Sequence, residues 1–232
     1  RYFVDQPAQR QFNVHRDLFR DAELFELEMA HVFEASWVYL CHESQLPRPY
    51  DYFSTWMGRR AVFVQRNGEG RIQGFLNACP HRGASLFFGR NEECGLRCIY
   101  HGWKYDVDGN VLDTPAEPGA SDFRKKLHHT AYPTHEAGGV IYAYLGPRDK
   151  MPLFPNYEWT QVPLDQTYVT KCLLECNYLQ GLEGECDSSH LSFLHRAFSN
   201  ERNQLLYKSD TSPVYETEET DFGVRLIATR NT

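Results

Sequence analysis

Two short cysteine–histidine motifs constrain this chain more than any other feature. The first reads Cys79-Pro80-His81 and the second Cys98-Ile99-Tyr100-His101. Each motif offers one thiolate and one imidazole, so two loop tips can each supply both donor types to one centre. Two thiolates suit one ferric iron and two imidazoles suit the other. The spacing therefore predicts a [2Fe-2S] cluster with Cys79, His81, Cys98 and His101 as ligands.

Two other uses of these donors remain open on spacing alone. Zinc takes sets of two cysteines and two histidines, although it usually pairs like with like along the sequence. A disulfide between Cys79 and Cys98 would require an oxidising compartment. The chain holds 7 cysteines at irregular spacing, which favours a reducing compartment in which thiols bind metal or lie buried. Cys41, Cys172, Cys176 and Cys186 are expected to be small apolar packing residues.

The charge and hydropathy patterns exclude two classes of partner. The formal net charge is -7, and no basic stretch is longer than Arg124-Lys125-Lys126, so little could neutralise a nucleic-acid backbone. No apolar run is long enough to span a membrane, and Arg1 does not begin a signal peptide. The expectation is a soluble, cytoplasmic protein with no nucleic-acid or membrane partner.

The order of predicted elements suggests two domains. Helical spacing covers residues 14–36, as one amphipathic helix or two joined near Asp21, with Asn13 as the predicted cap. Short strands and turns follow, including a hairpin at Asn67-Gly68. A proline-rich stretch at 147–163 ends this region. The last part reads as a strand at 168–175, a helix at 176–195 and two strands within 214–229.

A second group of metal-binding residues lies on the predicted helix at 176–195. Asp187 and His190 are three residues apart and would share a helical face, so the carboxylate could hold the outer N–H of the imidazole. His195 lies about 140° around an ideal helix from His190. Both histidines can meet one metal only if the helix widens or breaks between them. Alone, this motif is a weak signal.

The first pair of motifs resembles the cluster loops of Rieske [2Fe-2S] proteins. The match extends through Gly83-Ala84 and Gly102-Trp103-Lys104-Tyr105, which are similar to the loops of Rieske non-haem iron oxygenases. Electron-transport Rieske proteins usually carry two further cysteines between the arms. Here Cys94 is the single extra cysteine, which favours the oxygenase branch.

The resemblance also assigns roles to the second group. It implies that His190 and His195 bind a mononuclear Fe(II) and that Asp187 is the catalytic bridge to a cluster histidine of the neighbouring subunit. Glu183 and Gly184 occupy a region where many members carry asparagine. The third ligand, a carboxylate, lies far downstream in the family and is expected beyond Thr232. Glu201, Asp210 and Asp221 are carboxylates after His195, but none of these three matches the family position.

The stretches 85–93 and 187–195 look closest to the phthalate 4,5-dioxygenase-like class. The resemblance implies an α+β fold, in which a small all-β Rieske domain precedes the first part of a helix-grip catalytic domain, in a homotrimer. The expected division is an N-terminal helical segment at 1–36 packing on the catalytic domain, the Rieske domain at 37–150, a linker at 151–163 and the catalytic part at 164–232.

The implied function is that of an oxygenase component. An NAD(P)H-dependent reductase would supply electrons, and O2 would serve to hydroxylate or O-demethylate an aromatic, carboxylated substrate. Two other functions remain open. One is a Rieske-type electron carrier or fragment without oxygen chemistry, and the other is a zinc-stabilised binding module.

Overall fold

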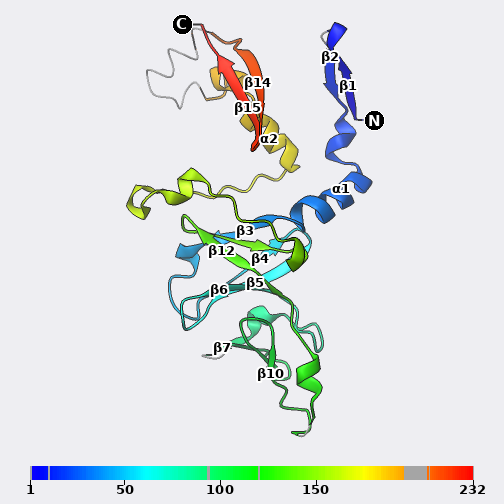
Figure 1. Ribbon diagram of the computed structural model, residues 1–232, viewed down its shortest axis with the longest axis vertical. Helices are drawn as coiled ribbons and strands as arrows, with labels where there is room; N and C mark the ends of the chain where they lie inside the picture. Colours follow the sequence, from blue (N-terminus) through cyan, green and yellow to red (C-terminus); the bar gives the residue numbers. More distant parts are fainter. Residues whose placement is uncertain are drawn as a thin grey trace. The chain divides into compact units, whose positions relative to one another are not determined.

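The computed structural model describes residues 2–9, 11–92, 95–119, 121–195, 208 and 210–231 (Figure 1). The chain divides into two compact units. One contains Arg1–Asp21 with Thr170–Thr232, and the other is Ala22–Val169. In the described part of the chain, no helix is both long and apolar enough to cross a membrane.

The described strands are short and pair only in antiparallel fashion. They are β1 (Phe3–Gln6), β2 (Gln11–Val14), β3 (Trp37–His42), β4 (Tyr52–Met57), β5 (Arg60–Arg66), β6 (Ile72–Leu76), β7 (Arg90–Glu92), β8 (Gly95–Arg97), β9 (Lys104–Tyr105), β10 (Val111–Asp113), β11 (Ala131–Tyr132), β12 (Thr134–Ala137), β13 (Val140–Tyr144), β14 (Val214–Thr220) and β15 (Gly223–Thr229).

The described helices are also short. The α-helices are α1 (Ala22–Glu28) and α2 (Tyr178–Cys186), and a π-helix spans Met29–Phe33. The 3-10 helices are Pro7–Gln9, Arg16–Phe19, Glu43–Gln45, Leu86–Phe88, Phe123–Lys126, Arg148–Lys150, Glu158–Gln161, Leu164–Gln166 and Ser189–Ser192.

Two sheets form the first core of the Ala22–Val169 unit. Their strand orders are β11-β6-β5-β4 and β12-β13-β3. β5 is a central strand whose residues from Val62 to Gln65 are all buried, as its continuous apolar run suggests. Burying each large apolar side chain contributes about 2 kcal/mol. The buried members of this core are Leu40, Cys41, Leu46, Met57, Val62, Val64, Ile72, Tyr132, Ile141 and Ala143.

The predicted hairpin between β5 and β6 is confirmed, but its positive φ lies elsewhere in the turn. The Asn67 side-chain oxygen accepts hydrogen bonds from the backbone N–H groups of Glu69 (3.0 Å) and Arg71 (2.8 Å). The residue with positive φ is Gly70, at 83°, rather than Asn67 or Gly68. Asn67 therefore shapes the turn through its side chain.

A third sheet, of order β10-β9-β8-β7, builds the end of this unit that carries the cysteine–histidine motifs (Figure 1). Its core joins the β11-β6-β5-β4 sheet through Phe63 on β5 and Phe75 on β6. Both motif cysteines belong to this core, together with Trp103 and Tyr105.

The N-terminal segment is less helical than its spacing predicts. Asn13 does not cap a helix as the spacing predicts, because it pairs with Val4 in the β1–β2 ladder. His15 takes that role instead, because its Nδ1 accepts from the backbone N–H of Asp17 at 3.2 Å. A 3-10 helix and α1 then meet at the predicted joint near Asp21. The cross-strand hydrogen bonds of β2 outweigh the local preference for a helix.

The segment 1–36 is shared between the two units. Residues up to Asp21 fall in the unit with Thr170–Thr232, and the chain from Ala22 onward falls in the unit with the β-sheets. Ion pairs tie this later part to the β4–β5 turn. Arg59 lies 2.6 Å from Glu26 and 3.5 Å from Glu34.

Two predictions for the second half of the chain are wrong. Residues 168–175 form no strand, because alternation alone gives no ladder without a partner strand. The predicted helix at 176–195 is interrupted. It starts where the Asn177 side chain accepts from the backbone N–H of Leu179 at 2.9 Å, and α2 ends at Cys186.

The β14–β15 hairpin has two different faces. One face carries Tyr215, Leu226 and Ala228, and the other carries the ion pair between Glu218 and Arg225 at 2.6 Å. Alternation places these residues on opposite faces because successive side chains point to opposite sides of a strand. The two strands predicted within 214–229 are confirmed.

Candidate metal sites

The two cysteine–histidine loops have the same backbone geometry. In the first loop, the N–H of Cys79 donates to the carbonyl of Ala84 and the N–H of Gly83 donates to the carbonyl of Cys79, both at 2.8 Å. In the second loop the same pattern is formed by Cys98, Gly102 and Trp103, with bonds of 2.8 and 3.0 Å.

Each loop also turns at a glycine in the left-handed region. Gly83 has φ of 73° and Gly102 has φ of 74°. A residue with a Cβ would adopt this conformation only with strain. The glycine after each histidine therefore lets both loops close in the same way.

These loops bring the four predicted cluster ligands together as two like pairs. The sulfurs of Cys79 and Cys98 approach closely enough to interact, and their residues are only 3% and 1% exposed. The rings of His81 and His101 lie with centroids 4.4 Å apart. This pairing matches the division of ligands that a [2Fe-2S] cluster with two thiolates and two imidazoles requires.

The protonation and hydrogen bonding of these groups also fit such a cluster. The Nδ1 atom of His81 is buried and has no hydrogen-bond partner among the described residues. Burial, with smaller effects of His101 and Arg82, lowers the pKa of His81 and favours the neutral imidazole that binds metal. Burial raises the pKa of Cys98, so a thiolate there needs a cation to compensate it. A metal cluster would bind the buried Nδ1 atom of His81 and the buried sulfurs of Cys79 and Cys98.

Two aromatic residues surround the predicted cluster site. Trp103 stacks on His81 with centroids 4.6 Å apart and planes at 4°. The hydroxyl of Tyr105 lies 2.9 Å from the sulfur of Cys79. Burial, followed by the contact with Cys79, raises the pKa of Tyr105, so its hydroxyl keeps the proton that it can donate to a thiolate. Tyr105 belongs to the second sequence motif, but the motif alone does not indicate that its hydroxyl contacts the Cys79 sulfur.

The remaining cysteines differ in part from expectation. Cys94 lies outside the described residues. All six described cysteines are reduced, and Cys41 is buried as predicted. The other three are exposed rather than packed in a core; they are Cys172, Cys176 and Cys186.

The second predicted site forms where α2 ends. Asp187 does not continue the helix but caps it in an extended conformation. Its two carboxylate oxygens accept from the backbone N–H groups of Ser189 (2.7 Å) and His190 (3.1 Å). A short polar side chain that competes for backbone N–H groups in this way ends one helix and begins the next. His190 then lies in the 3-10 helix Ser189–Ser192.

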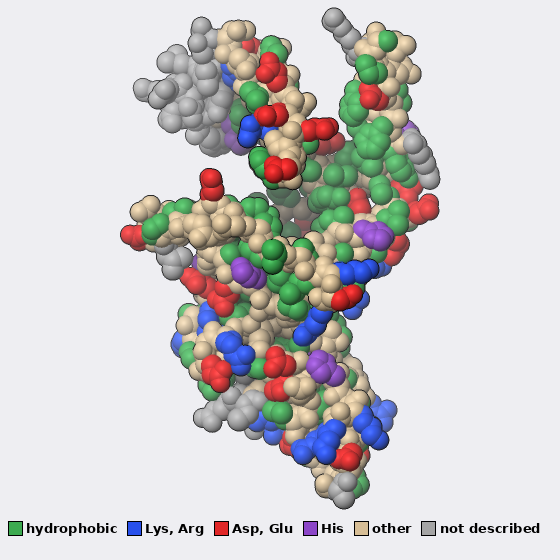
Figure 2. Space-filling view, viewed as in Figure 1, with side chains coloured by type: hydrophobic (Ala, Val, Ile, Leu, Met, Phe, Trp, Pro, Cys, Tyr) green, Lys and Arg blue, Asp and Glu red, His purple; other side chains and the backbone are tan. Residues whose placement is uncertain are grey.

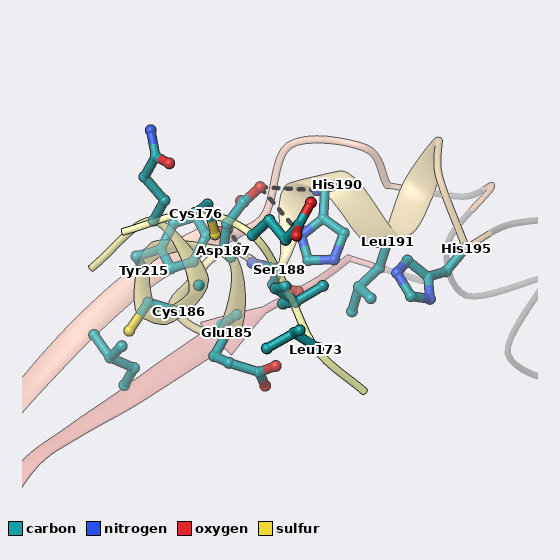
Figure 3. Close-up of a pocket in the computed structure, with 17 residues that line it drawn as sticks. Leu173, Cys176, Glu185, Cys186, Asp187, Ser188, His190, Leu191, His195 and Tyr215 are labelled. Atoms are coloured by element: carbon teal, nitrogen blue, oxygen red, sulfur yellow. Dashed lines mark hydrogen bonds and ion pairs between the residues drawn. The ribbon is translucent and has the colours of Figure 1, made fainter. Parts of the chain in front are cut away.

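This break brings Asp187, His190 and His195 together by a different route from the predicted shared helix face. The Oδ2 atom of Asp187 lies 3.3 Å from Nδ1 of His190, and the rings of His190 and His195 have centroids 5.1 Å apart (Figure 3). Both histidines line a hollow of about 910 Å³, together with Tyr215 and Leu226 of the hairpin. Hydrogen bonds from the backbone of Ser189, then from Tyr215 and His190, lower the pKa of Asp187.

His190 and His195, with the Asp187 carboxylate next to His190, fit two of the three protein ligands of a non-haem iron site with two histidines and one carboxylate. Within the described ranges, no group of three histidine, cysteine or carboxylate side chains surrounds a single metal position. Glu201 lies outside the described residues. The Asp210 carboxylate accepts from the backbone of Ser212 and Asn231, and Asp221 lies in the β14–β15 turn.

Comparison with known proteins finds a matching family for each of the two regions that carry the candidate metal sites. The Rieske [2Fe-2S] domain family matches residues 36–132, and the family described as LigXa C-terminal domain like matches residues 143–232. A crystal structure of a quaternary ammonium Rieske monooxygenase aligns with a TM-score of 0.50 at 24% identity, covering 56% of this chain and 37% of that one. This likeness shows the fold.

Curated relatives are closer in sequence. The phthalate 4,5-dioxygenase oxygenase subunit of Pseudomonas putida is 42% identical over 179 residues, which are 73% of this chain and 41% of that protein. The 3-chlorobenzoate-3,4-dioxygenase oxygenase subunit of Comamonas testosteroni is 37% identical over 163 residues, or 68% of this chain and 38% of that protein. The chain spans about two fifths of the length of these relatives. With both family matches in succession along its sequence, the chain belongs to the Rieske [2Fe-2S] domain family over residues 36–132 and continues in a LigXa C-terminal domain like region, and its sequence is similar to the oxygenase subunits of aromatic-ring dioxygenases.

Proposed function

We propose that this chain is the oxygenase component of a multicomponent system that hydroxylates or O-demethylates an aromatic carboxylate. The names of the two relatives support the substrate class, since phthalate and 3-chlorobenzoate are both aromatic carboxylates. In the proposed system, a separate reductase supplies electrons from NAD(P)H, O2 is the second substrate, and the oxygenase is a homotrimer.

The proposal assigns the metal ligands residue by residue. Cys79 and Cys98 hold one iron of the [2Fe-2S] cluster, and His81 and His101 hold the other. His190 and His195 hold a mononuclear Fe(II). When bound, the cluster passes on single electrons and the mononuclear iron supplies the place where dioxygen is activated.

The observation that carries the proposal is the contact of Asp187 with His190. With Oδ2 of the ionised carboxylate 3.3 Å from Nδ1, the imidazole keeps its proton on Nδ1 and leaves Nε2 for a metal. Asp187 is exposed, so its carboxylate is also accessible to the cluster histidine of a neighbouring subunit. In the proposed trimer this residue bridges the two metal sites.

The surface near the cluster loops supports the proposed reductase partner. The 3-10 helix Phe123–Lys126 carries Arg124, Lys125 and Lys126, and Figure 2 shows Lys and Arg side chains gathered at this end of the unit. The ring of Phe123 meets Trp103 edge-on at 6.0 Å, and Trp103 stacks on His81. A positively charged surface next to the cluster suits an acidic electron donor.

Iron content and EPR spectra of the reduced holoenzyme test this function. We expect about three irons per chain, and a rhombic EPR signal with an average g below the free-electron value. His190→Ala should lower the content to about two irons and leave the cluster signal unchanged. His31→Ala, at an exposed histidine of the π-helix, is the matched control. Two irons in the wild type would favour the electron carrier, and a colourless zinc protein would favour the binding module.

A further inference from the structure

The β14–β15 hairpin sends two polar side chains onto the segment that carries Asp187 and His190. Tyr215 comes from β14, and Arg230 directly follows β15. Figure 3 shows Tyr215 beside Asp187 in the wall of the hollow that both histidines line. Neither residue belongs to the metal-binding motif, and both lie far from it in sequence.

The hydroxyl of Tyr215 is saturated with hydrogen bonds. Its oxygen accepts from the backbone N–H groups of Ser188 (2.8 Å) and Ser189 (3.0 Å). It donates its own proton to Oδ1 of Asp187 at 3.0 Å. One hydroxyl thus satisfies the first N–H groups of the 3-10 helix and holds one oxygen of the carboxylate.

This contact decides which oxygen of Asp187 faces His190. Oδ1 is held by Tyr215 and by the N–H of Ser189, so Oδ2 remains for the N–H and the ring Nδ1 of His190. With both oxygens held, the carboxylate cannot turn away from the imidazole. The orientation of the His190 ring therefore depends on a tyrosine from another element.

Arg230 holds the other side of the same segment. Its guanidinium donates to the carbonyl oxygen and the hydroxyl of Ser188, to the hydroxyl of Ser192 and to the carbonyl oxygen of Asp210. Ser188 precedes the 3-10 helix and Ser192 ends it, and Ser192 is only 2% exposed. The planar fork of arginine thereby links both ends of the short helix that carries His190.

We propose that Tyr215 and Arg230 are positioning residues, which hold Asp187 and His190 in the geometry that binds the mononuclear metal. The inference rests on the proposed function, because it takes His190 and His195 as the ligands. Partners of metal-binding histidines typically change metal affinity 10- to 100-fold when they are removed. Here the effect passes through Asp187, so an increase in Kd of about tenfold is expected.

The test is a Co(II) titration of the protein with its [2Fe-2S] cluster in place and oxidised, after the mononuclear metal has been removed. The oxidised cluster is diamagnetic, so the EPR spectrum reports Co(II) alone. In Tyr215→Phe we expect the Kd for Co(II) to rise about tenfold, with a changed Co(II) line shape. Arg230→Gln should act in the same direction.

The matched controls make the same chemical changes away from this segment. Tyr168→Phe removes the hydroxyl of a side chain that is 91% exposed, and Arg225→Gln changes the opposite face of the same hairpin. Neither control should alter the Kd or the line shape. If Tyr215→Phe binds Co(II) with the wild-type affinity and line shape, the inference is wrong.

A second measurement separates this inference from the proposed function. Amide hydrogen exchange of residues 187–192 in the metal-free protein should be faster in Tyr215→Phe than in the wild type, because the N–H of Ser188 loses its acceptor and the N–H of Ser189 keeps only the Asp187 carboxylate. Unchanged exchange would overturn the positioning role whatever metal is bound. If His190→Ala instead binds Co(II) like the wild type, the assignment of the metal ligands is at fault, and the exchange data still decide the role of Tyr215.

Discussion

His81 and Trp103 stack face to face, with ring centroids 4.6 Å apart and ring planes at 4°. Trp103 is only 3% exposed, and it covers one face of an imidazole whose buried Nδ1 atom finds no hydrogen-bond partner in the part of the chain that the structure describes. The stack shields the histidine from water and fixes the plane in which its nitrogens lie. The two loops thus place a tryptophan from one motif over the histidine of the other.

Replacing Trp103 should weaken the unit and expose the proposed cluster. Trp103→Ala removes a buried indole, which costs about 3 kcal/mol of unfolding free energy, and opens His81 to water. We expect faster bleaching of the visible absorption in air and a lower midpoint in urea. Trp56→Ala, at a side chain that is 69% exposed, should change neither. Equal bleaching rates in Trp103→Ala and wild type would contradict the shielding role.

Removing the hydroxyl of Tyr105 should lower the reduction potential of the cluster. The hydroxyl lies 2.9 Å from the sulfur of Cys79, and a hydrogen bond to a ligand sulfur stabilises the reduced, more negative cluster. A loss of about 1 kcal/mol of differential stabilisation corresponds to about 40 mV for one electron. A redox titration of Tyr105→Phe followed by EPR measures this shift. A potential that stays the same or rises would exclude the hydrogen bond as a determinant.

His129 should make the Ala22–Val169 unit less stable in acid. It is 1% exposed, stacks on Phe75 with centroids 5.9 Å apart and lies tilted against Tyr105 at 4.9 Å. Burial lowers the pKa of His129 to about 4. The unfolded chain titrates near pH 6.5, so it binds more protons than the folded chain between about pH 6.5 and 4. The free energy of unfolding therefore falls as the pH drops through this window, by about 3 kcal/mol in all.

Urea unfolding at several pH values checks this effect. The difference in unfolding free energy between wild type and His129→Phe should change across the window, because the variant lacks the titrating group. His128→Phe, at the exposed neighbour, should show the same pH dependence as the wild type. Parallel curves for His129→Phe and wild type would mean that His129 does not titrate in this way.

Asp187→Ala should separate metal binding from turnover. With Fe(II) supplied in excess, both metal sites should remain detectable in the holoenzyme, while turnover falls by about 100-fold because the bridge and the partner of His190 are lost. Asp221→Ala, in the hairpin turn, is the control. Full activity of Asp187→Ala would rule out the bridging role.

The two cluster loops could be predicted from sequence because their geometry is local. Each loop closes with hydrogen bonds between residues only four or five positions apart, such as Gly102 to Cys98 and Cys98 to Trp103. The glycine that permits the turn lies within the same motif. Similar locality explains the β5–β6 hairpin, where Asn67 makes its contacts within four residues.

The second site shows where sequence reasoning reached its limit. The spacing of Asp187, His190 and His195 predicted that they belong together, and predicted that a continuous helix could not unite the two histidines. It did not show that α2 ends at Cys186, nor that residues 168–175 lack a partner strand. Local propensity favours a helix or a strand but cannot supply the competing hydrogen bonds that end it.

The sequence by itself determined the residue types, the spacing of the metal donors and the tight glycine turns, because these depend on chemistry within a few residues. Only the tertiary structure decided which groups surround them. Tyr105 on β9 reaches Cys79 in the loop after β6, and Tyr215 reaches Asp187 from 28 residues away. Such contacts have no signature in local periodicity, since they depend on how separate strands and loops pack against one another.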